Sequence, residues 1–468
     1  SGTSSVGAGA VKGVDAMLPL GLASIAAALR DWSARCGVNL KLQILDMPAA
    51  GLTAMQVVEE IDRFDPDIIG MSVLTASASA AAQLTQALKQ VKPQRFIVWG
   101  GVHATLAGER LLRTTAANAI IAGAGEKSFI RLAEAFLDAG GSEETLCQRL
   151  KDVPGASFVT SKDGRQKIVT VSAGNNELDD TLVPAYELFD LEQYCWHGYR
   201  TLPLESHRGC RGNCSFCVVP RLSGCEVASR SPGAFINLLS VCSRHGAERA
   251  YVVSDNFSGD PGWLSQLCTL VRKQPPEIAL EVYCRADDIA RNKETARQLK
   301  EIGVRTVFVG VESGDAKVLR SYSKNLSLRQ IEHAFRTLAG EGLQIIGSFL
   351  LGAPDETEES VVASIDFANY LKSIAPFLLH LTFATPYPGT KLRQCFEGEG
   401  LALPDEDAPL DPHQAPCWCT KHLSRSRLCE LRDEFEHKFY TGEYVARLRC
   451  VGVDEGMVRG FARGLTRP

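Results

Sequence analysis

The chain has 468 residues, of which 45% are hydrophobic and 22% are charged, and its formal net charge at pH 7 is −5. At roughly 100–200 residues per domain, this length predicts two or three domains with sizeable cores. Because the net charge is negative, we expect no basic surface that would bind nucleic acid. The sequence also lacks the long apolar run of a membrane span. The 15 cysteines are scattered without a disulfide framework, and the first residues lack the order of a signal peptide. We therefore expect a cytoplasmic protein.

Strand-like and helix-like stretches alternate over residues 1–140. The run DIIGMSVL at 67–74 is continuously apolar, which predicts a central parallel strand buried on both faces. The alternation predicts an α/β, doubly wound Rossmann-like domain whose ligands bind at the carboxyl ends of the strands. The expected helices are 18–32, 53–64 and 78–91, and the expected strands are 41–46, 67–74, 95–101 and 118–126.

Residues 141–200 break this rhythm and indicate a linker, in which an Asp-Gly turn between two short strands predicts a hairpin. Over residues 201–400 the alternation resumes, and six strand–helix units predict a partial (β/α)6 TIM barrel with its active site at the carboxyl ends of the strands. Residues 401–468 predict a small helical region, which we expect to cover the mouth of the barrel. The expected barrel strands are 202–206, 250–254, 279–284, 305–311, 345–351 and 378–384, with helices at 232–245, 294–302, 327–341, 357–373 and 424–440.

The stretch HRGCRGNCSFCVV, at 207–219, places three cysteines directly after the first barrel strand. Cys210, Cys214 and Cys217 have the spacing C-x3-C-x2-C, and the aromatic Phe216 precedes the last of them. Thiolates this close can hold three corners of a 4Fe-4S cluster and leave its fourth iron open to a small molecule that carries an amine and a carboxylate. A zinc site completed from afar, or three ordinary buried cysteines, are the alternatives.

This loop resembles the signature of the radical S-adenosylmethionine (SAM) superfamily. The resemblance implies that the three cysteines ligate the cluster, that the open iron binds the methionine end of SAM, and that reductive cleavage yields a 5′-deoxyadenosyl radical. VVSDNFSGD, YCRAD, FVGVESG and GSFLLGAP, at the ends of the next four strands, also resemble family segments. Each residue taken alone is equally consistent with a structural role. The resemblance implies that Ser254 and Asp255 lie near the amino group of SAM, Arg285 near its carboxylate, and Glu312 and Ser313 near its ribose.

The N-terminal domain resembles the cobalamin-binding domain of one radical SAM subgroup, through LPLGLASIAAAL, WGGVHAT and AGAGEKSF. With the barrel, the resemblance covers about residues 1–400. Hydroxyl groups after the third strand can bind the cobalamin tail or simply cap a helix. We expect His103 to contact the corrin edge or the tail, or to be structural, rather than to ligate cobalt. The candidate cobalamin-binding residues are Thr75, Ser77, Gly100, Gly101, His103, Gly123, Gly125 and Glu126.

Cobalamin binders often present D-x-H-x-x-G after the second strand, and that histidine ligates cobalt from below. Here Asp46 and Gly51 are in register, but Pro48 stands in place of the histidine. Since proline cannot ligate a metal, we predict cobalamin bound in a histidine-off state.

These resemblances imply a cobalamin-dependent radical SAM methyltransferase acting on an unactivated carbon or phosphorus centre of a small-molecule or peptide natural-product precursor. A non-methylating rearrangement or cyclisation, or a polar methylation, uses the same cofactors. A tRNA methylthiotransferase is less consistent, because it needs three further N-terminal cysteines and only Cys36 and Cys147 are present there. A cobalamin sensor without catalysis does not account for the intact cysteine loop.

The segment YPGT after the sixth barrel strand places Tyr387 at a turn near the mouth, where it is a candidate catalytic or substrate-contacting residue. Cys417, Cys419 and Cys429 lack the spacing of an auxiliary cluster, which favours a structural role. We expect a monomer that receives electrons from an external donor such as flavodoxin or ferredoxin. The sequence does not identify the substrate.

Overall fold

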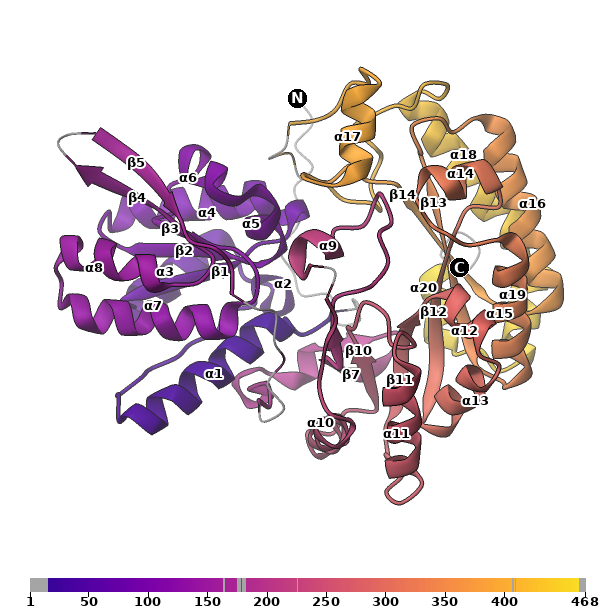
Figure 1. Cartoon of the computed structure of the whole chain (residues 1–468), viewed down its shortest axis with the longest axis horizontal. Helices are drawn as coiled ribbons and strands as arrows, with labels where there is room; N and C mark the ends of the chain where they lie inside the picture. Colours follow the sequence, from indigo (N-terminus) through magenta and orange to yellow (C-terminus); the bar gives the residue numbers. More distant parts are fainter. Residues whose placement is uncertain are drawn as a thin grey trace. The chain divides into compact units, whose positions relative to one another are not determined.

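The computed structural model describes residues 16–162, 165–174, 178, 182–224, 226–405, 408 and 410–462. Within these limits the chain forms two compact units, one with residues 16–174 and 182–196 and the other with residues 197–405 and 410–462 (Figure 1). The predicted Asp-Gly turn, at residues 163 and 164, lies outside the described residues, as do residues 1–15. None of the helices in this part of the chain has the length and apolar character that a membrane span requires.

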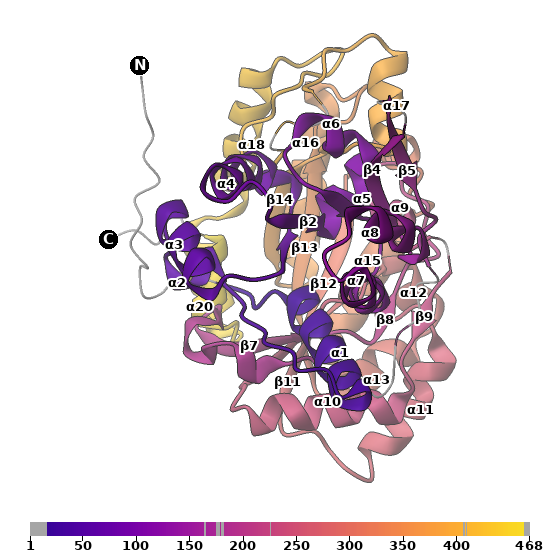
Figure 2. The ribbon, with the colours of Figure 1, turned by 90° about the vertical axis from the view of Figure 1, so that its left-hand side faces the viewer.

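The first unit contains a five-stranded sheet in the order β1-β2-β3-β4-β5. Its first three strands pair in parallel. The hairpin predicted in the linker segment forms as β4 and β5, and it continues this sheet in antiparallel fashion. Trp99 belongs to a hydrophobic cluster with helices α3 and α4, whereas its neighbour Val98 belongs to a second cluster with α7. Because successive residues of a strand point to opposite faces, helices cover both faces of this sheet, and the doubly wound prediction is confirmed (Figure 2). The strands are β1 (Ile68–Ser72), β2 (Phe96–Gly100), β3 (Ala119–Ile121), β4 (Ala156–Lys162) and β5 (Arg165–Thr170); the helices are α1 (Leu20–Cys36), α2 (Met47–Ala50), α3 (Ala54–Phe64), α4 (Ala78–Val91), α5 (Gly101–Ala107), α6 (Leu111–Thr114), α7 (Gly125–Ala139) and α8 (Glu143–Arg149).

The predicted strand at 41–46 is wrong, because these residues form no strand. Leu45 packs against the core without taking part in a sheet ladder. As a consequence β1 lies at the edge of the sheet, and of its residues only Ile69 is buried. The apolar run at 67–74 therefore predicts the strand correctly but not its central position.

The second unit is built on six parallel strands that lie side by side in chain order, from β7 to β10, β11, β12, β13 and β14. The order does not return to its start, so the sheet is an open partial barrel, as predicted. Burial alternates along β12, where Val307, Val309 and Val311 are sealed on one face and Phe308 points to the other. Its strands are β7 (Tyr199–Leu204), β10 (Arg249–Val252), β11 (Ala279–Cys284), β12 (Val304–Glu312), β13 (Gln344–Leu351) and β14 (Leu378–Phe383), with the short strands β8 (His207–Arg208) and β9 (Ala228–Ser229) between β7 and β10. The short strand β6 (Cys195–Trp196) lies among the residues of the first unit.

Helices follow the barrel strands and begin at recognisable caps. Ser231 and Asp260 each accept a backbone hydrogen bond at the start of a helix that has proline in its first turn. Ser327 and Gln330 form a reciprocal capping box at the start of α15. The helices are α9 (Val219–Leu222), α10 (Pro232–Arg244), α11 (Pro261–Val271), α12 (Ala286–Arg291), α13 (Glu294–Glu301), α14 (Ala316–Ser321), α15 (Leu328–Gly340), α16 (Glu358–Ile374), α17 (Lys391–Gly398), α18 (Arg425–Phe439), α19 (Gly442–Cys450) and α20 (Glu455–Phe461).

The C-terminal region reaches both ends of the barrel. Asp454, the residue before α20, accepts hydrogen bonds from Arg249 at 2.5 Å and Arg305 at 3.4 Å, which lie at the amino-terminal ends of β10 and β12. At the opposite end, Phe383 N donates to Pro412 O at 2.9 Å, and Lys421 N to Pro354 O at 3.0 Å. The expectation that the C-terminal helices cover the mouth is therefore wrong for α20, because its ion pairs hold it at the far end.

Candidate active site

The cysteine loop follows β7 and is held by residues at the end of β10. Ser254 Oγ accepts the backbone N–H groups of Ser206 and His207, both at 3.0 Å. Asp255 Oδ2 accepts the N–H of Gly209 at 2.8 Å, and burial raises the pKa of this carboxyl while that hydrogen bond opposes the rise. Ser254 and Asp255 thus fix the entry of the loop, and their predicted contact with SAM stays a prediction.

The middle of the loop is tied to two further segments. Ser215 N donates to Tyr322 O at 2.8 Å, and the Phe216 and Tyr322 rings meet edge to face with centroids 5.3 Å apart. From the other side, Leu392 N at the start of α17 donates to Ser215 O at 2.7 Å. The segment that carries the three cysteines is therefore tied to the Tyr322 segment on one side and to α17 on the other.

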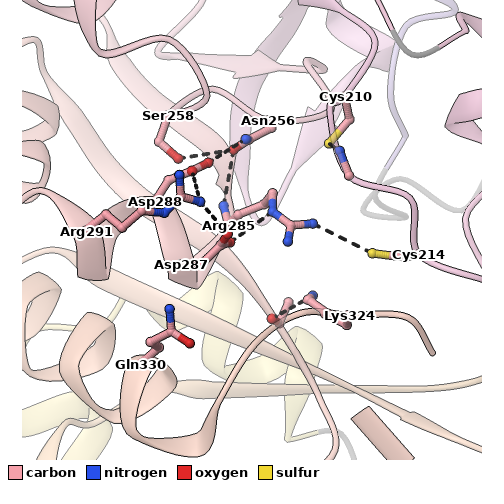
Figure 3. A network of polar contacts seen from close by, with 12 residues as sticks. Cys210, Cys214, Asn256, Ser258, Arg285, Asp287, Asp288, Arg291, Lys324 and Gln330 are labelled. Carbon is pink, nitrogen blue, oxygen red and sulfur yellow. Dashed lines mark hydrogen bonds and ion pairs between the residues drawn. The ribbon is translucent and has the colours of Figure 1, made fainter. Parts of the chain in front are cut away.

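Two of the three sulfur atoms already accept hydrogen bonds. Gly212 N lies 3.3 Å from Cys210 Sγ, and Arg285 Nη1 lies 3.7 Å from Cys214 Sγ (Figure 3). A Cβ on Gly212 would lie 2.7 Å from Arg285 Nη1, so a larger residue here would displace the guanidinium from its present place.

The donor set fits an iron–sulfur cluster. Burial raises the pKa of Cys210, and it raises the pKa of Cys217 to about 12, so both free thiols hold their protons at neutral pH. Iron binds thiolates, and loading must therefore release these protons. Among the residues described, no three His, Cys, Asp or Glu side chains converge on a point that could hold one metal ion. Cluster ligands need not converge in this way, because each thiolate binds a different iron.

A carboxylate and amide network sets the direction of Arg285. Asp287 Oδ1 accepts Arg285 Nε at 2.9 Å, and Asn256 Oδ1 accepts Arg285 N at 3.2 Å (Figure 3). Asn256 Nδ2 in turn donates to Asp288 Oδ2 at 2.7 Å. Burial alone lowers the pKa of Arg285, but Asp287 and Cys214 outweigh it, and the guanidinium stays cationic. The sequence analysis did not include Asn256 and Asp287, although both lie in the segments quoted there.

Glu312 ends β12 in a left-handed conformation, with φ of 67°. Lys324, a residue that the sequence analysis missed, forms an ion pair with the Glu312 carboxylate and donates to Gly310 O at 2.9 Å. The two charged side chains are only 6% and 8% exposed. Ser313 differs, because its hydroxyl lies 3.0 Å from Ser364 Oγ and accepts Asp315 N, so it is engaged within the fold.

In the first unit, several candidate cobalamin residues gather at the carboxyl ends of β1 and β2. His103 Nδ1 lies 3.4 Å from Thr75 Oγ1, and both side chains are buried. Gly101, with φ of 89°, approaches so closely that a Cβ would lie 3.0 Å from Val73 N. Ser77 Oγ accepts Leu74 N at 3.3 Å and donates to Leu74 O at 3.1 Å, so it closes the turn before α4 and makes no side-chain cap bond to that helix.

The other glycine-rich segment follows β3. Gly123, with φ of 83°, donates its N–H to Thr105 Oγ1 at 2.9 Å. Gly100 is less crowded, because a Cβ there would meet only Ile121 O, at 3.8 Å. A Cβ on Gly125 would lie 2.6 Å from Ile25 Cδ1, so this glycine allows α1 and α7 to pack. Glu126 lies in the first turn of α7.

The loop with proline in place of histidine folds into the short helix α2. Asp46 caps it by accepting Ala49 N at 3.3 Å, and its second oxygen accepts the Tyr194 hydroxyl at 2.8 Å. Gly51 ends the helix with φ of 62°. Tyr194 was not among the predicted residues, and it fixes this loop from a position 148 residues away.

Tyr387 lies on the turn after β14, as predicted. Its backbone carbonyl accepts Thr390 Oγ1 at 2.7 Å, and burial raises the pKa of its hydroxyl to about 12. Cys417, Cys419 and Cys429 take part in no group of possible metal ligands within the described part of the chain.

Comparison with known protein families assigns two segments of the chain. Residues 10–133 match the B12 binding domain, and residues 204–368 match the Radical SAM superfamily. An uncharacterized methyltransferase of Pyrococcus horikoshii is 29% identical over 388 residues, which are 82% of this chain and 80% of that protein. The anaerobic magnesium-protoporphyrin IX monomethyl ester cyclase of Cereibacter sphaeroides is 22% identical over 345 residues, which are 72% of this chain and 54% of the cyclase.

Among solved structures, the radical SAM methyltransferase TsrM from Kitasatospora setae, with cobalamin and a 4Fe-4S cluster bound, aligns with a TM-score of 0.66. It is 16% identical, and the alignment covers 93% of this chain and 86% of TsrM, which shows a shared fold. The chain therefore combines a B12 binding domain with a radical SAM domain, and these two domains imply a 4Fe-4S cluster, SAM and cobalamin as its cofactors.

Proposed function

We propose that this cobalamin-dependent radical SAM enzyme is a methyltransferase that methylates an unactivated carbon or phosphorus centre of a small-molecule or peptide natural-product precursor. The proposal rests on a cysteine loop whose Cys214 Sγ faces Arg285 at 3.7 Å, in a chain that also has a B12 binding domain. When bound, SAM and the cluster supply a 5′-deoxyadenosyl radical, and methylcobalamin supplies the methyl group. The Pyrococcus relative is named a methyltransferase, which supports transfer over rearrangement.

We assign Arg285 to the carboxylate of SAM. Its guanidinium lies beside Cys214 and is kept cationic by Asp287, so it can pair with a carboxylate held at the neighbouring open iron. Glu312 has one carboxylate oxygen on Lys324, whereas its other oxygen bonds no described residue and is not sealed from solvent. This oxygen can accept hydrogen bonds from the vicinal hydroxyls of the SAM ribose.

We also propose that cobalamin is bound histidine-off. Pro48 offers no donor, and Asp46 is already engaged with Ala49 N and the Tyr194 hydroxyl. The chain loaded with cob(II)alamin should therefore give an EPR spectrum without the splitting that a lower nitrogen ligand causes. Nitrogen splitting in the wild-type spectrum would contradict the assignment, and a Pro48→His variant provides the comparison.

The deciding experiment is anaerobic reconstitution of the full chain with iron, sulfide, cobalamin and SAM labelled in its methyl group. We expect the label on cobalamin before substrate is added and in the product afterwards, with mass spectrometry as the readout. The electron donor, for which we propose a flavodoxin or ferredoxin, is replaced by a chemical reductant. A Cys214→Ala variant should lose cluster iron, and full retention of iron would contradict the ligand assignment.

The cyclase relative defines the second candidate, a rearrangement or cyclisation with the same cofactors. The same experiment separates the two reactions. Consumption of substrate with release of 5′-deoxyadenosine, but without label in the product, would favour cyclisation over methyl transfer.

A further inference from the structure

Arg221 brings a guanidinium to the turn that follows the last barrel strand. It lies on α9, four residues after Cys217, and its side chain rests on Gly389 of the segment YPGT. A Cβ on Gly389 would lie 3.0 Å from Arg221 Nε and 3.5 Å from both Cζ and Nη2. Gly389 has φ of 75°, which favours glycine a second time. Both the contact with the guanidinium and the backbone conformation therefore favour glycine at this position.

This contact is part of a built wall and not a chance approach of two loops. Ser215, between Cys214 and Cys217, accepts Leu392 N at 2.7 Å, so the cysteine loop and the segment after Gly389 are joined a second time. The turn is closed by Thr390 Oγ1, which donates to Tyr387 O at 2.7 Å. Arg221 and Tyr387 therefore belong to one connected wall beside the cysteine loop.

The charge of Arg221 is not neutralised within this wall. No carboxylate of the described residues forms an ion pair with it, and the side chain is exposed. Nearby arginines differ, since Arg208 pairs with Glu205 at 2.9 Å and Arg393 with Glu397 at 3.0 Å. A guanidinium that contacts Gly389 and has no carboxylate partner keeps N–H groups available for a planar or tetrahedral anion.

We propose that Arg221, with the turn of Tyr387 and Gly389, is the substrate-binding site for an anionic group, a carboxylate, phosphate or phosphonate. The inference rests on the proposed function, because it requires that the substrate approach the cysteine loop. SAM is the other anion that must bind nearby, and Arg285 already serves its carboxylate. Arg285 follows β11, whereas Arg221 contacts the turn after β14, three strands further along the sheet. We therefore assign the two cations to different ligands.

The test uses the reconstituted full chain with cluster, cobalamin and SAM bound. Benzoate and phenylphosphonate are the anion probes, benzamide is the neutral control, and affinity is measured by titration calorimetry at low salt. We expect both anions to bind about tenfold more tightly than benzamide, the size of one charge-assisted hydrogen-bonded contact at a partly exposed site. Arg221→Gln should abolish this preference, and Arg221→Lys should retain part of it.

Arg211 provides the matched control, because it is an exposed arginine between Cys210 and Cys214 and it likewise has no ion pair with a described residue. Arg211→Gln removes the same charge and should leave the preference for anions intact. Gly389→Ala should weaken anion binding like Arg221→Gln, because its Cβ displaces the guanidinium.

Three results would overturn the proposal: equal binding of anions and benzamide by the wild type, an unchanged preference in Arg221→Gln, or equal losses in the two arginine variants. A tenfold loss of SAM affinity in Arg221→Gln would also overturn it, because the cation would then serve SAM. Failure of the proposed function gives a different signature, namely absence of cluster iron or cobalamin in the wild type.

Discussion

The ion pair between Lys324 and Glu312 provides a quantitative test of how the end of β12 is built. Both side chains are more than 90% buried, and each would be left as an uncompensated charge if its partner were removed. Breaking a buried pair in this way costs about 3–5 kcal/mol. Lys324→Met should therefore lower the free energy of unfolding of the second unit by about this amount, or its melting temperature by roughly 10 °C. Differential scanning calorimetry of the full chain measures the shift.

The pair also predicts strong coupling. Glu312→Gln alone leaves Lys324 buried without its carboxylate, whereas the double variant leaves neither charge. The double variant should thus be roughly 2 kcal/mol more stable than the sum of the two single effects predicts. The pair of Arg336 and Glu332 on α15 is the control, because its side chains are 51% and 30% exposed, and Arg336→Met should cost less than about 1 kcal/mol. Additive single effects, or equal costs for Lys324→Met and Arg336→Met, would refute the reasoning.

Three further predictions test other parts of the second unit. Burial raises the pKa of Glu356 to about 7, so the folded state keeps a proton that the unfolded state releases above pH about 4.5. Stability should fall by up to about 3 kcal/mol as pH rises through this window, and denaturation of Glu356→Gln at several pH values should show a flatter profile. Gly347→Ala should cost about 1–3 kcal/mol in urea unfolding, because its Cβ would lie 2.8 Å from the Phe377 ring, and a cost below about 0.5 kcal/mol would contradict this packing. Asp454→Ala should free α20 from Arg249, which faster amide hydrogen exchange in α20 would reveal.

The fold was largely predictable because alternation of strand and helix patterns is a local property. All six barrel strands and the hairpin lie where the patterns predict them. The prediction of a strand at 41–46 is wrong because an apolar pattern indicates which residues are buried, but not whether their backbone pairs with a neighbouring strand. Leu45 is packed on the core, yet the segment makes no ladder with its neighbours. The place of α20 was beyond pattern analysis, since it depends on Asp454 meeting Arg249, 205 residues away.

The candidate site also contains some residues that local sequence patterns predict and others that only tertiary contacts reveal. The spacing of Cys210, Cys214 and Cys217 predicts a cluster because all three expected ligands lie within one short loop. Lys324, Tyr194 and Arg221 gave no local signal, because each acts on a residue of another segment, at Glu312, Asp46 and Gly389. An isolated lysine, tyrosine or arginine is ordinary in a sequence, and only the tertiary contact distinguishes it.

The contacts of the cysteine loop also show which substitutions should report on geometry and which on ligand binding. Ser254 Oγ and Asp255 Oδ2 accept hydrogen bonds from backbone N–H groups of the cysteine loop. Replacing either residue should therefore first alter the path of this loop. Arg285 faces a sulfur atom, and one Glu312 oxygen has no partner among the described residues, so these are the two side chains that we propose to bind SAM. A change at Ser254 should therefore lower cluster content, whereas a change at Arg285 should lower SAM affinity in a chain that still holds its iron. Measuring iron and SAM binding separately distinguishes residues that position the loop from residues that bind the cofactor.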